Sequence, residues 1–320
     1  MTPAAPWYAG VDVGGTRLKC AVVGTSGEVL ARHTEPSAGR AFGDLIDTTT
    51  AWIRAKQERM GAGPTGIGVA TPGITRLREG PVLLPGRLAG SEGYPLVSRL
   101  STEFGAGAVC LNDGDAAALG EHRFGAARGE RRLVVVTLGT GVGGGVLIDG
   151  ELLGDLETGE GPYLGHIVMD PAGEPCLCGN RGCAETRVSA NAVVGRLLAA
   201  LKRGVPSGLA ERFREDPAAI GFEQLTAAAR DGDPLAHEVL AGFEEDLVSY
   251  LVSLAHLFAP TAIAVGGGVM HASAGFLPRV RAAVRARQFR APGVPPVRVV
   301  RAGSIDFAGA RGACVPLMPR

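Results

Sequence analysis

The sequence lacks an excess of charge of either sign and lacks any long apolar run. Its 320 residues carry 32 lysines and arginines against 32 aspartates and glutamates, so no net positive field gathers nucleic acid. No apolar run approaches the roughly 18 residues that span a bilayer. The stretch Met1 to Pro6 shows no charged segment followed by an apolar one. We therefore expect no nucleic-acid partner, no membrane partner and no secretory signal.

Cysteine is scarce, and half of it is concentrated in one short stretch. Three of the six cysteines, Cys176, Cys178 and Cys183, lie close together, with His166 just upstream. Few, clustered thiols fit metal binding in a reducing cytoplasm better than a disulfide framework. Thiolate and imidazole are preferred zinc ligands, and four of them leave no open position for a reactive water. The cluster predicts a structural Zn²⁺ site; buried free thiols or a labile disulfide are the alternative.

Apolar and β-branched runs, broken by glycine turns, alternate with longer segments of helical periodicity. With 46% hydrophobic residues, the chain is long enough for two compact α/β lobes. We place these lobes at 1–114 and 115–304. The expected strands are 8–13, 18–23, 29–33, 66–70, 107–111, 133–137, 145–150 and 262–265. The expected helices are 42–60, one from about 115, about 187–203, 235–258 and 305–317.

Each lobe opens with a strand, a glycine turn and a returning strand. The second turn, which starts at Gly139, contains G-x-G-x-x-G, but a dinucleotide site needs a helix directly after the turn, and 145–150 is expected to be a strand. A glycine turn between strands can still present backbone N–H groups to phosphate. A plain hairpin is the alternative for either turn alone. Two such turns, with Asp12 beside the first, favour a nucleotide whose Mg²⁺ is held by Asp12 through water.

The expected nucleotide-binding residues lie in three glycine segments. Lys19 belongs near the phosphates or on the surface, and the glycines after the last predicted strand let a purine ring approach the backbone. The full set is Asp12, Gly14, Gly15, Thr16, Lys19, Gly139, Thr140, Gly141, Gly266, Gly267 and Gly268.

Asp113 is the candidate catalytic base. It follows an apolar strand and precedes a helix, and phosphoryl transfer needs one carboxylate to take the proton of the acceptor hydroxyl. An Asn-Asp pair at such a turn is also typical of a helix cap, so the position alone leaves both roles open.

The spacing C-x-C-G-x-x-G-C-x-E, together with the glycine motifs in order, resembles the ROK family of bacterial sugar kinases and sugar-responsive repressors. The resemblance implies the duplicated actin and hexokinase fold (ribonuclease H-like), with the C-terminal helix at about 305–320 completing the first lobe. It also implies a homodimer, and that Asn112, His166 and Glu185 contact the sugar while Asp113 is the base. The segments that carry it are 12–16, 66–73, 112–113, 137–145, 165–166, 176–185 and 266–268.

Two positions depart from the glucose kinases of that family. Those kinases carry Glu and Asn where this chain has Tyr163 and Arg87. Losing a carboxylate that binds a hydroxyl leaves polar groups unpaired at a cost of a few kcal/mol, so we expect glucose to be a poor acceptor. Neutral drift at both positions is the alternative.

The resemblance thus predicts an ATP-dependent kinase for the primary hydroxyl of a hexose or hexose-like ring. The altered shell favours an amino sugar such as kanosamine or a C7-cyclitol such as a valiolone, and the added arginine favours the neutral cyclitol. An ordinary glucokinase is one alternative. The other is a sugar-responsive regulator; such repressors carry a DNA-binding module before the first phosphate motif, and only six residues precede Trp7 here.

Overall fold

The computed structural model describes residues 5–83, 88–272, 275–303 and 307–319. The chain divides into two compact units, one formed by residues up to 131, 145–162 and from 302 on, the other by 132–144 and 163–301. The lobes predicted from the sequence place 115–131 and 145–162 in the second lobe instead, and they stay a prediction.

The first unit is built on a five-stranded sheet with the order β3-β2-β1-β4-β7. The first three strands form the predicted antiparallel meander, and β4 and β7 run parallel to β1. The elements are β1 (Trp7–Val13), β2 (Arg17–Gly24), β3 (Val29–Pro36), α1 (Phe42–Met60), β4 (Gly66–Thr71), β5 (Ile74–Arg76), β6 (Gly80–Leu83), α2 (Leu96–Phe104), β7 (Gly107–Asn112), α3 (Asp113–Phe124), β10 (Glu151–Leu152), α11 (Ala308–Ala313) and a 3₁₀ turn at Val315–Leu317.

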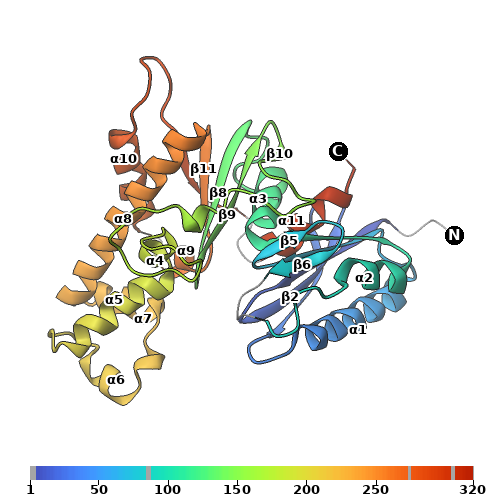
Figure 1. Cartoon of the computed structure of the whole chain (residues 1–320), viewed down its shortest axis with the longest axis horizontal. Helices are drawn as coiled ribbons and strands as arrows, with labels where there is room; N and C mark the ends of the chain where they lie inside the picture. Colours follow the sequence, from blue (N-terminus) through green and yellow to red (C-terminus); the bar gives the residue numbers. More distant parts are fainter. Residues whose placement is uncertain (1–4, 84–87, 273–274, 304–306, 320) are drawn as a thin grey trace. The chain divides into compact units, whose positions relative to one another are not determined.

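Alternation along β1 gives this sheet two apolar faces, because successive side chains of a strand point to opposite sides. Trp7 and Val11 belong to a cluster with residues of α1 and α2, such as Phe42 and Leu96. The neighbouring Tyr8 belongs to a second cluster with residues of α11. Figure 1 shows α1 and α2 next to each other, on the same side of the strands. The sheet is therefore a buried central layer with helices on both faces.

Two glycines allow α11 to lie directly on the sheet. A Cβ at Gly10 would stand 2.1 Å from the Ala310 carbonyl oxygen, and one at Gly68 would stand 2.1 Å from that of Ala313. Any larger residue would push the helix away. The C-terminal segment thus packs on strands near the start of the chain, as the family resemblance implied.

The second sheet has the order β10-β9-β8-β11-β12, with β11 parallel to both β8 and β12. The remaining elements from 132 to 301 are β8 (Arg132–Leu138), β9 (Val142–Ile148), a 3₁₀ turn at Leu164–His166, α4 (Glu185–Val188), α5 (Ala190–Lys202), α6 (Ala210–Glu215), a 3₁₀ turn at Pro217–Ala219, α7 (Phe222–Arg230), α8 (Pro234–Phe258), β11 (Ala262–Gly266), α9 (Val269–Ala272), α10 (Leu277–Arg287) and β12 (Arg298–Arg301). The long helix α8 packs against β8 and against the helices α4, α5, α7 and α10.

Three aromatic rings hold the helices of the second unit together. Phe243 of α8 meets Phe222 of α7 and Phe276, which precedes α10, edge to face, each with ring centroids 5.7 Å apart. Such edge-to-face pairs add to the stabilisation from burial itself. Among the helices the structure describes, none is long and apolar enough to cross a membrane.

Candidate active site

Asp12 and Lys19 face each other across the first glycine turn. They are directly paired in the antiparallel register of β1 and β2, and the Lys19 Nζ lies 5.9 Å from the centroid of the Phe307 ring. The Lys19 side chain is half-buried, and its predicted place near the phosphates stays a prediction. Asp12 also touches α11, since a Cβ at Gly309 would stand 3.0 Å from its Oδ2.

Ser37 fixes the shape of the first turn. The turn is closed by a hydrogen bond from the Gly14 N–H to the Arg17 carbonyl, 3.0 Å long. The Ser37 hydroxyl donates to the Gly14 carbonyl at 2.6 Å, and the Ser37 N–H donates to the Thr16 carbonyl at 3.1 Å. Gly15 and Thr16 are exposed, so the tip of the turn remains open to a ligand.

Asn112 ends β7 and caps α3. Its Oδ1 accepts the N–H groups of Gly114 at 2.8 Å and Asp115 at 3.4 Å, and its Nδ2 donates to the Gly73 carbonyl at 2.8 Å. The helix therefore begins at Asp113, two residues earlier than expected. The cap leaves Asn112 one further Nδ2 hydrogen, so capping and a contact to an acceptor are compatible.

Three carboxyl groups meet electrostatically where β1 ends and α3 begins. Burial raises the pKa of Asp12 to about 6, the charge of Asp113 adds to this rise, and Lys19 opposes it. Burial also raises the pKa of Asp115 to about 7, again with a contribution from Asp113. Carboxyl groups with raised pKa values at a strand end are typical of functional sites. The cluster stores negative charge that a cation would stabilise.

The sequence prediction missed Asp115. Its Oδ1 lies 3.0 Å from where a Cβ at Gly145 would stand, so the side chain is directed at β9. A second acidic residue in the first turn of α3 was visible beside Asp113, and such residues stabilise helix starts. Stabilisation of the helix start is enough to explain an acidic residue at 115. The local pattern therefore does not indicate that Asp115 also interacts with Asp113.

The second glycine turn lies between β8 and β9. A strand follows it, as expected, and this agrees with the rejection of a dinucleotide site. The Gly139 N–H donates to the Gly141 carbonyl at 3.0 Å, and the Ala190 N–H at the start of α5 donates to the Gly139 carbonyl at 2.8 Å. Thr140 is exposed at its tip.

The glycines after β11 lie against the end of β8. Gly267 has φ +91°, and a Cβ there would stand 2.2 Å from the Leu138 carbonyl oxygen, whereas a Cβ at Gly268 would meet no atom within 4 Å. Gly266 is the last residue of β11. The segment thus combines one glycine that packing requires with one beside open space.

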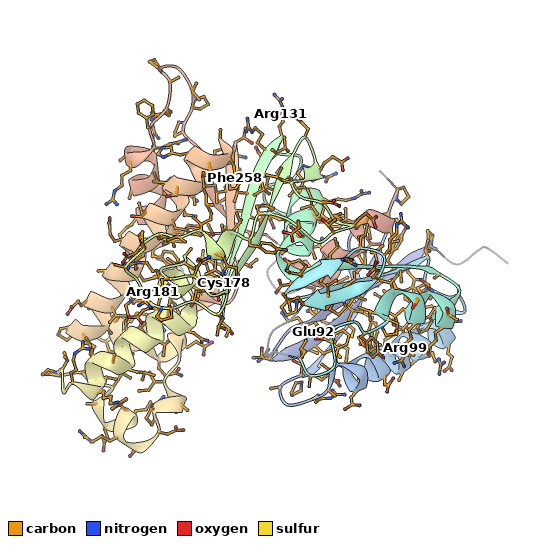
Figure 2. The ribbon with its side chains drawn as sticks, viewed as in Figure 1. Glu92, Arg99, Arg131, Cys178, Arg181 and Phe258 are labelled. Atoms are coloured by element: carbon orange, nitrogen blue, oxygen red, sulfur yellow. The ribbon has the colours of Figure 1, made fainter. Side chains whose placement is uncertain are left out.

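The segment 166–185, which we call the cysteine loop, brings its predicted metal ligands together. The ligand atoms of His166, Cys176, Cys178 and Cys183 all lie within 4.8 Å of one another. The two glycines in the loop have φ of +92° and +63°, and a Cβ at Gly182 would stand only 1.6 Å from the Asp170 carbonyl oxygen. Figure 2 shows Cys178 and Arg181 on this loop. The tight backbone explains how four distant ligands reach one point.

The donor set fits a tetrahedral zinc ion. Zinc bonds of about 2.3 Å to sulfur and about 2.0 Å to nitrogen place two sulfurs about 3.8 Å apart, and a sulfur and a nitrogen about 3.5 Å apart. Here the sulfurs of Cys178 and Cys183 are 3.6 Å apart, and Cys176 Sγ lies 3.5 Å from His166 Nδ1. All three cysteines are free thiols. The arrangement therefore suits a metal and shows no disulfide.

Three of the expected acceptor residues, Tyr163, His166 and Glu185, lie in or beside this loop. Tyr163 precedes the 3₁₀ turn that carries His166, and its side chain is 38% exposed. Glu185 begins α4, and its Oε2 accepts the Val142 N–H at 3.0 Å. This bond joins the loop to the second glycine turn, a contact that sequence reasoning did not foresee. Arg87 lies outside the described residues.

Comparison with known proteins bears on nearly the whole chain. The ROK family matches residues 8–318. A glucokinase of Thermotoga maritima is 32% identical over 264 residues, which cover 82% of each protein. A kanosamine kinase of Amycolatopsis mediterranei is 30% identical over 267 residues, which cover 82% of this chain and 80% of that enzyme.

Among solved structures, a ROK family glucokinase of Streptomyces griseus, crystallised with glucose and AMPPNP, superposes with a TM-score of 0.81 at 29% identity. The match covers 96% of this chain and 97% of that one. It confirms the predicted α/β fold of the actin and hexokinase type.

Proposed function

The chain belongs to the ROK family, and we propose that it transfers the γ-phosphoryl group of ATP to the primary hydroxyl of a hexose or hexose-like ring. Sugar kinase activity is supported by the named kinases that match over four fifths of the chain. The observation that carries the proposal is the placement of Asp113. It directly follows β7, in the sheet whose strand β1 carries Asp12 beside the first glycine turn.

Asp113 is the general base in this proposal. Its carboxylate accepts the proton of the primary hydroxyl as the oxygen attacks the γ-phosphorus, and the bond from that phosphorus to the bridging oxygen breaks to leave ADP. The first turn of α3 holds the base in place because Asn112 caps that turn. Asn112, His166 and Glu185 orient the acceptor, as the family resemblance implies.

Asp12 is suited to hold Mg²⁺ through water. Its buried carboxyl has a pKa raised to about 6, and a divalent cation would favour the ionised form. The ion supplies charge neutralisation on the transferred phosphoryl group. The two glycine turns, with Lys19, Thr16 and Thr140, offer N–H, ammonium and hydroxyl donors to the phosphates. Gly266, Gly267 and Gly268 leave room for the purine.

Zn²⁺ in the cysteine loop is a structural ion in this proposal. His166, Cys176, Cys178 and Cys183 would occupy all four positions, so the ion braces the loop and activates no water. His166 then orients the acceptor only through its neighbours or through ring atoms turned away from the metal.

The acceptor is proposed to differ from glucose. Tyr163 and Arg87 stand where glucose kinases of the family carry Glu and Asn, so two hydroxyl-binding groups are replaced. A neutral C7-cyclitol with an exocyclic CH₂OH fits this change best, because an arginine disfavours a cationic amino sugar. Matching or orphaning buried polar partners in this way is worth a few kcal/mol.

A coupled assay of ADP release tests the function. We would compare glucose, mannose, N-acetylhexosamines, kanosamine and valiolone-type cyclitols, each with Mg-ATP. A wild-type kcat/KM for glucose of about 10⁴ M⁻¹s⁻¹ or more would identify a plain glucokinase and reject the altered acceptor. Activity on none of these rings, with tight sugar binding, would favour the sugar-responsive regulator.

Reverting both positions sharpens the test. The double variant Tyr163→Glu, Arg87→Asn should raise kcat/KM for glucose and lower it for the preferred ring. The variant Glu174→Gln, an exposed residue of the cysteine loop, is the control and should leave both values unchanged.

A further inference from the structure

The cysteine loop touches the second glycine turn through a charged side chain. Glu185 comes two residues after the zinc ligand Cys183, and its Oε2 accepts the N–H of Val142 at 3.0 Å. Val142 directly follows the Gly139 to Gly141 turn and begins β9. Hydrogen bonds to ionised groups are roughly twice as strong as those between neutral groups. A carboxylate on the loop therefore fixes the end of the turn.

The segment that contains His166, the first of the four predicted ligands, also packs against Val142. Gly165, next to the zinc ligand His166, packs so closely beneath Val142 that a Cβ at 165 would stand 2.1 Å from the Val142 carbonyl oxygen. Leu164 lies against Gly144, with its Cδ1 2.9 Å from where a Cβ would stand. One metal ion bound by His166 and Cys183 would tie together the two segments that hold Val142.

The start of the turn is held from α5. Ala190, the first residue of that helix, donates its N–H to the Gly139 carbonyl at 2.8 Å, and Ser189 caps the helix by accepting the Ala192 N–H at 3.1 Å. The segment from Cys183 to Ala190 thus hydrogen-bonds to both ends of the turn. The Glu185 carboxylate accepts at one end, and the Ala190 backbone N–H donates at the other.

We propose that Glu185 is a positioning residue for the turn that receives the donor phosphates, and that zinc binding in the loop increases nucleotide affinity through it. This inference rests on the proposed function, in which the Gly139 to Gly141 turn binds ATP. It adds a donor-side role to the acceptor contact that the family resemblance implies for Glu185. A carboxylate has two oxygens and several acceptor positions, so both contacts can exist at once.

Substitutions at position 185 separate the two roles. Glu185→Ala removes the bond to Val142, and Glu185→Asp keeps the charge on a side chain one methylene too short to make it. Glu185→Gln keeps an oxygen that accepts the Val142 N–H. Glu174→Gln, in the same loop, is the matched control. The proteins are compared after zinc content has been measured for each.

Two measurements report on the turn without using catalysis. Hydrogen exchange of the peptide that spans 138–146 reports on the Val142 amide, and calorimetric titration with Mg-ADP in the absence of acceptor reports on the donor site. For Glu185→Ala and Glu185→Asp, loss of one charge-assisted bond should speed Val142 exchange and weaken ADP binding, each about tenfold. Glu185→Gln should stay within about threefold of wild type, and Glu174→Gln should match it. Chelation of zinc from the wild type should accelerate Val142 exchange.

Each other outcome overturns a stated claim. Unchanged Val142 exchange and unchanged ADP affinity in Glu185→Ala and Glu185→Asp at full zinc content would refute the positioning role. If Glu185→Ala fails to fold, Glu185→Asp decides alone. Weakening of ADP binding in Glu185→Gln as large as in Glu185→Ala would show that charge, and not the bond to Val142, matters. If the wild type binds no ADP under any condition, the proposed function is rejected instead. Val142 exchange still tests the contact with Glu185 in that case, because it does not require nucleotide binding.

Discussion

The two glycine turns are similar in sequence but are held in different ways. In the first, Ser37 donates to the carbonyls of Gly14 and Thr16 from the segment just after β3. In the second, the carboxylate of Glu185 accepts a backbone N–H, and α5 donates to a carbonyl. The first support is neutral and self-contained. The second belongs to a loop with a metal-binding arrangement, so the motif itself does not reveal what stabilises the turn.

The largest effect should come from Asp113→Asn. Removing the general base lowers kcat by about 10²- to 10⁴-fold, and steady-state kinetics with the preferred acceptor will measure it. Because asparagine keeps the size and polarity of the side chain, calorimetric affinity for the acceptor should remain close to wild type. Asp44→Asn, an exposed carboxylate in α1, is the control. A kcat within a few-fold of wild type would exclude Asp113 as the base.

Loss of zinc should affect the second glycine turn and leave the first unchanged. Cys178→Ser should abolish the 1:1 zinc content and lower Tm by about 5 °C or more, because a structural zinc contributes directly to folding free energy. Elemental analysis and thermal unfolding measure both. Exchange at Val142 should accelerate, while exchange at Gly14, held by Arg17, should not. Cys314→Ala, a buried thiol outside the cluster, should retain zinc. Full zinc retention in Cys178→Ser would show that the loop binds metal otherwise or not at all.

The pH dependence of stability should originate in the first unit. The folded-state pKa of Asp115 is raised by burial to about 7 from an ordinary value of 3.8, so the folded state holds the proton more tightly. Its stabilising contribution is complete below the unfolded pKa and is lost as pH rises toward 7.

Asp115→Asn removes this titration. We expect the unfolding free energy of wild type, relative to Asp115→Asn, to fall by on the order of 1 to 3 kcal/mol between pH 4 and pH 8. Urea unfolding without Mg²⁺ at several pH values measures it. Asp44→Asn should show no such difference from wild type, and a pH-independent difference for Asp115→Asn would contradict the assignment.

The smallest effect should come from Ser37→Ala. It removes the hydroxyl bond to the Gly14 carbonyl while keeping the backbone bond to Thr16, which costs about 1 kcal/mol. Mg-ADP affinity should fall by a few-fold, and zinc chelation should add to this loss independently. Ser98→Ala, an exposed serine of α2, is the control. A non-additive response to zinc would show that the two turns share a support.

Much of the fold could be predicted from local pattern. Helix α1 begins and ends at the residues expected, since apolar periodicity and a glycine stop at Gly61 agree there. Of the strands beside the glycine turns, β1, β2 and β8 lie within one residue of the expected bounds. The strand expected at 145–150 begins three residues earlier and ends two earlier, as β9 (Val142–Ile148). The edge strand β12 (Arg298–Arg301) was missed because it alternates arginine with valine in a short run, and α10 was missed because its many arginines obscure the apolar stripe.

The sequence is enough to propose the residues of the candidate site, but not the contacts between them. The four predicted zinc ligands converge, as their spacing indicated. The bond from Glu185 to Val142, in contrast, joins residues 43 positions apart, and Asp115 interacts with Asp113 through burial that only the folded chain creates. Local sequence carries no record of the pairing of Glu185 with Val142, nor of the burial that raises the pKa of Asp115.

The close packing of α11 on the first sheet has a consequence for folding during synthesis. The face of the first sheet that contains Tyr8 and Gly10 is covered by residues synthesised about 300 positions later, and Arg311 even donates to the Gly27 carbonyl across 284 positions. During synthesis, that apolar face must remain uncovered until residues 307–318 have left the ribosome. Contacts of such high sequence separation slow folding and leave apolar surface exposed to association. Folding of the first unit therefore cannot be completed before α11 has been synthesised.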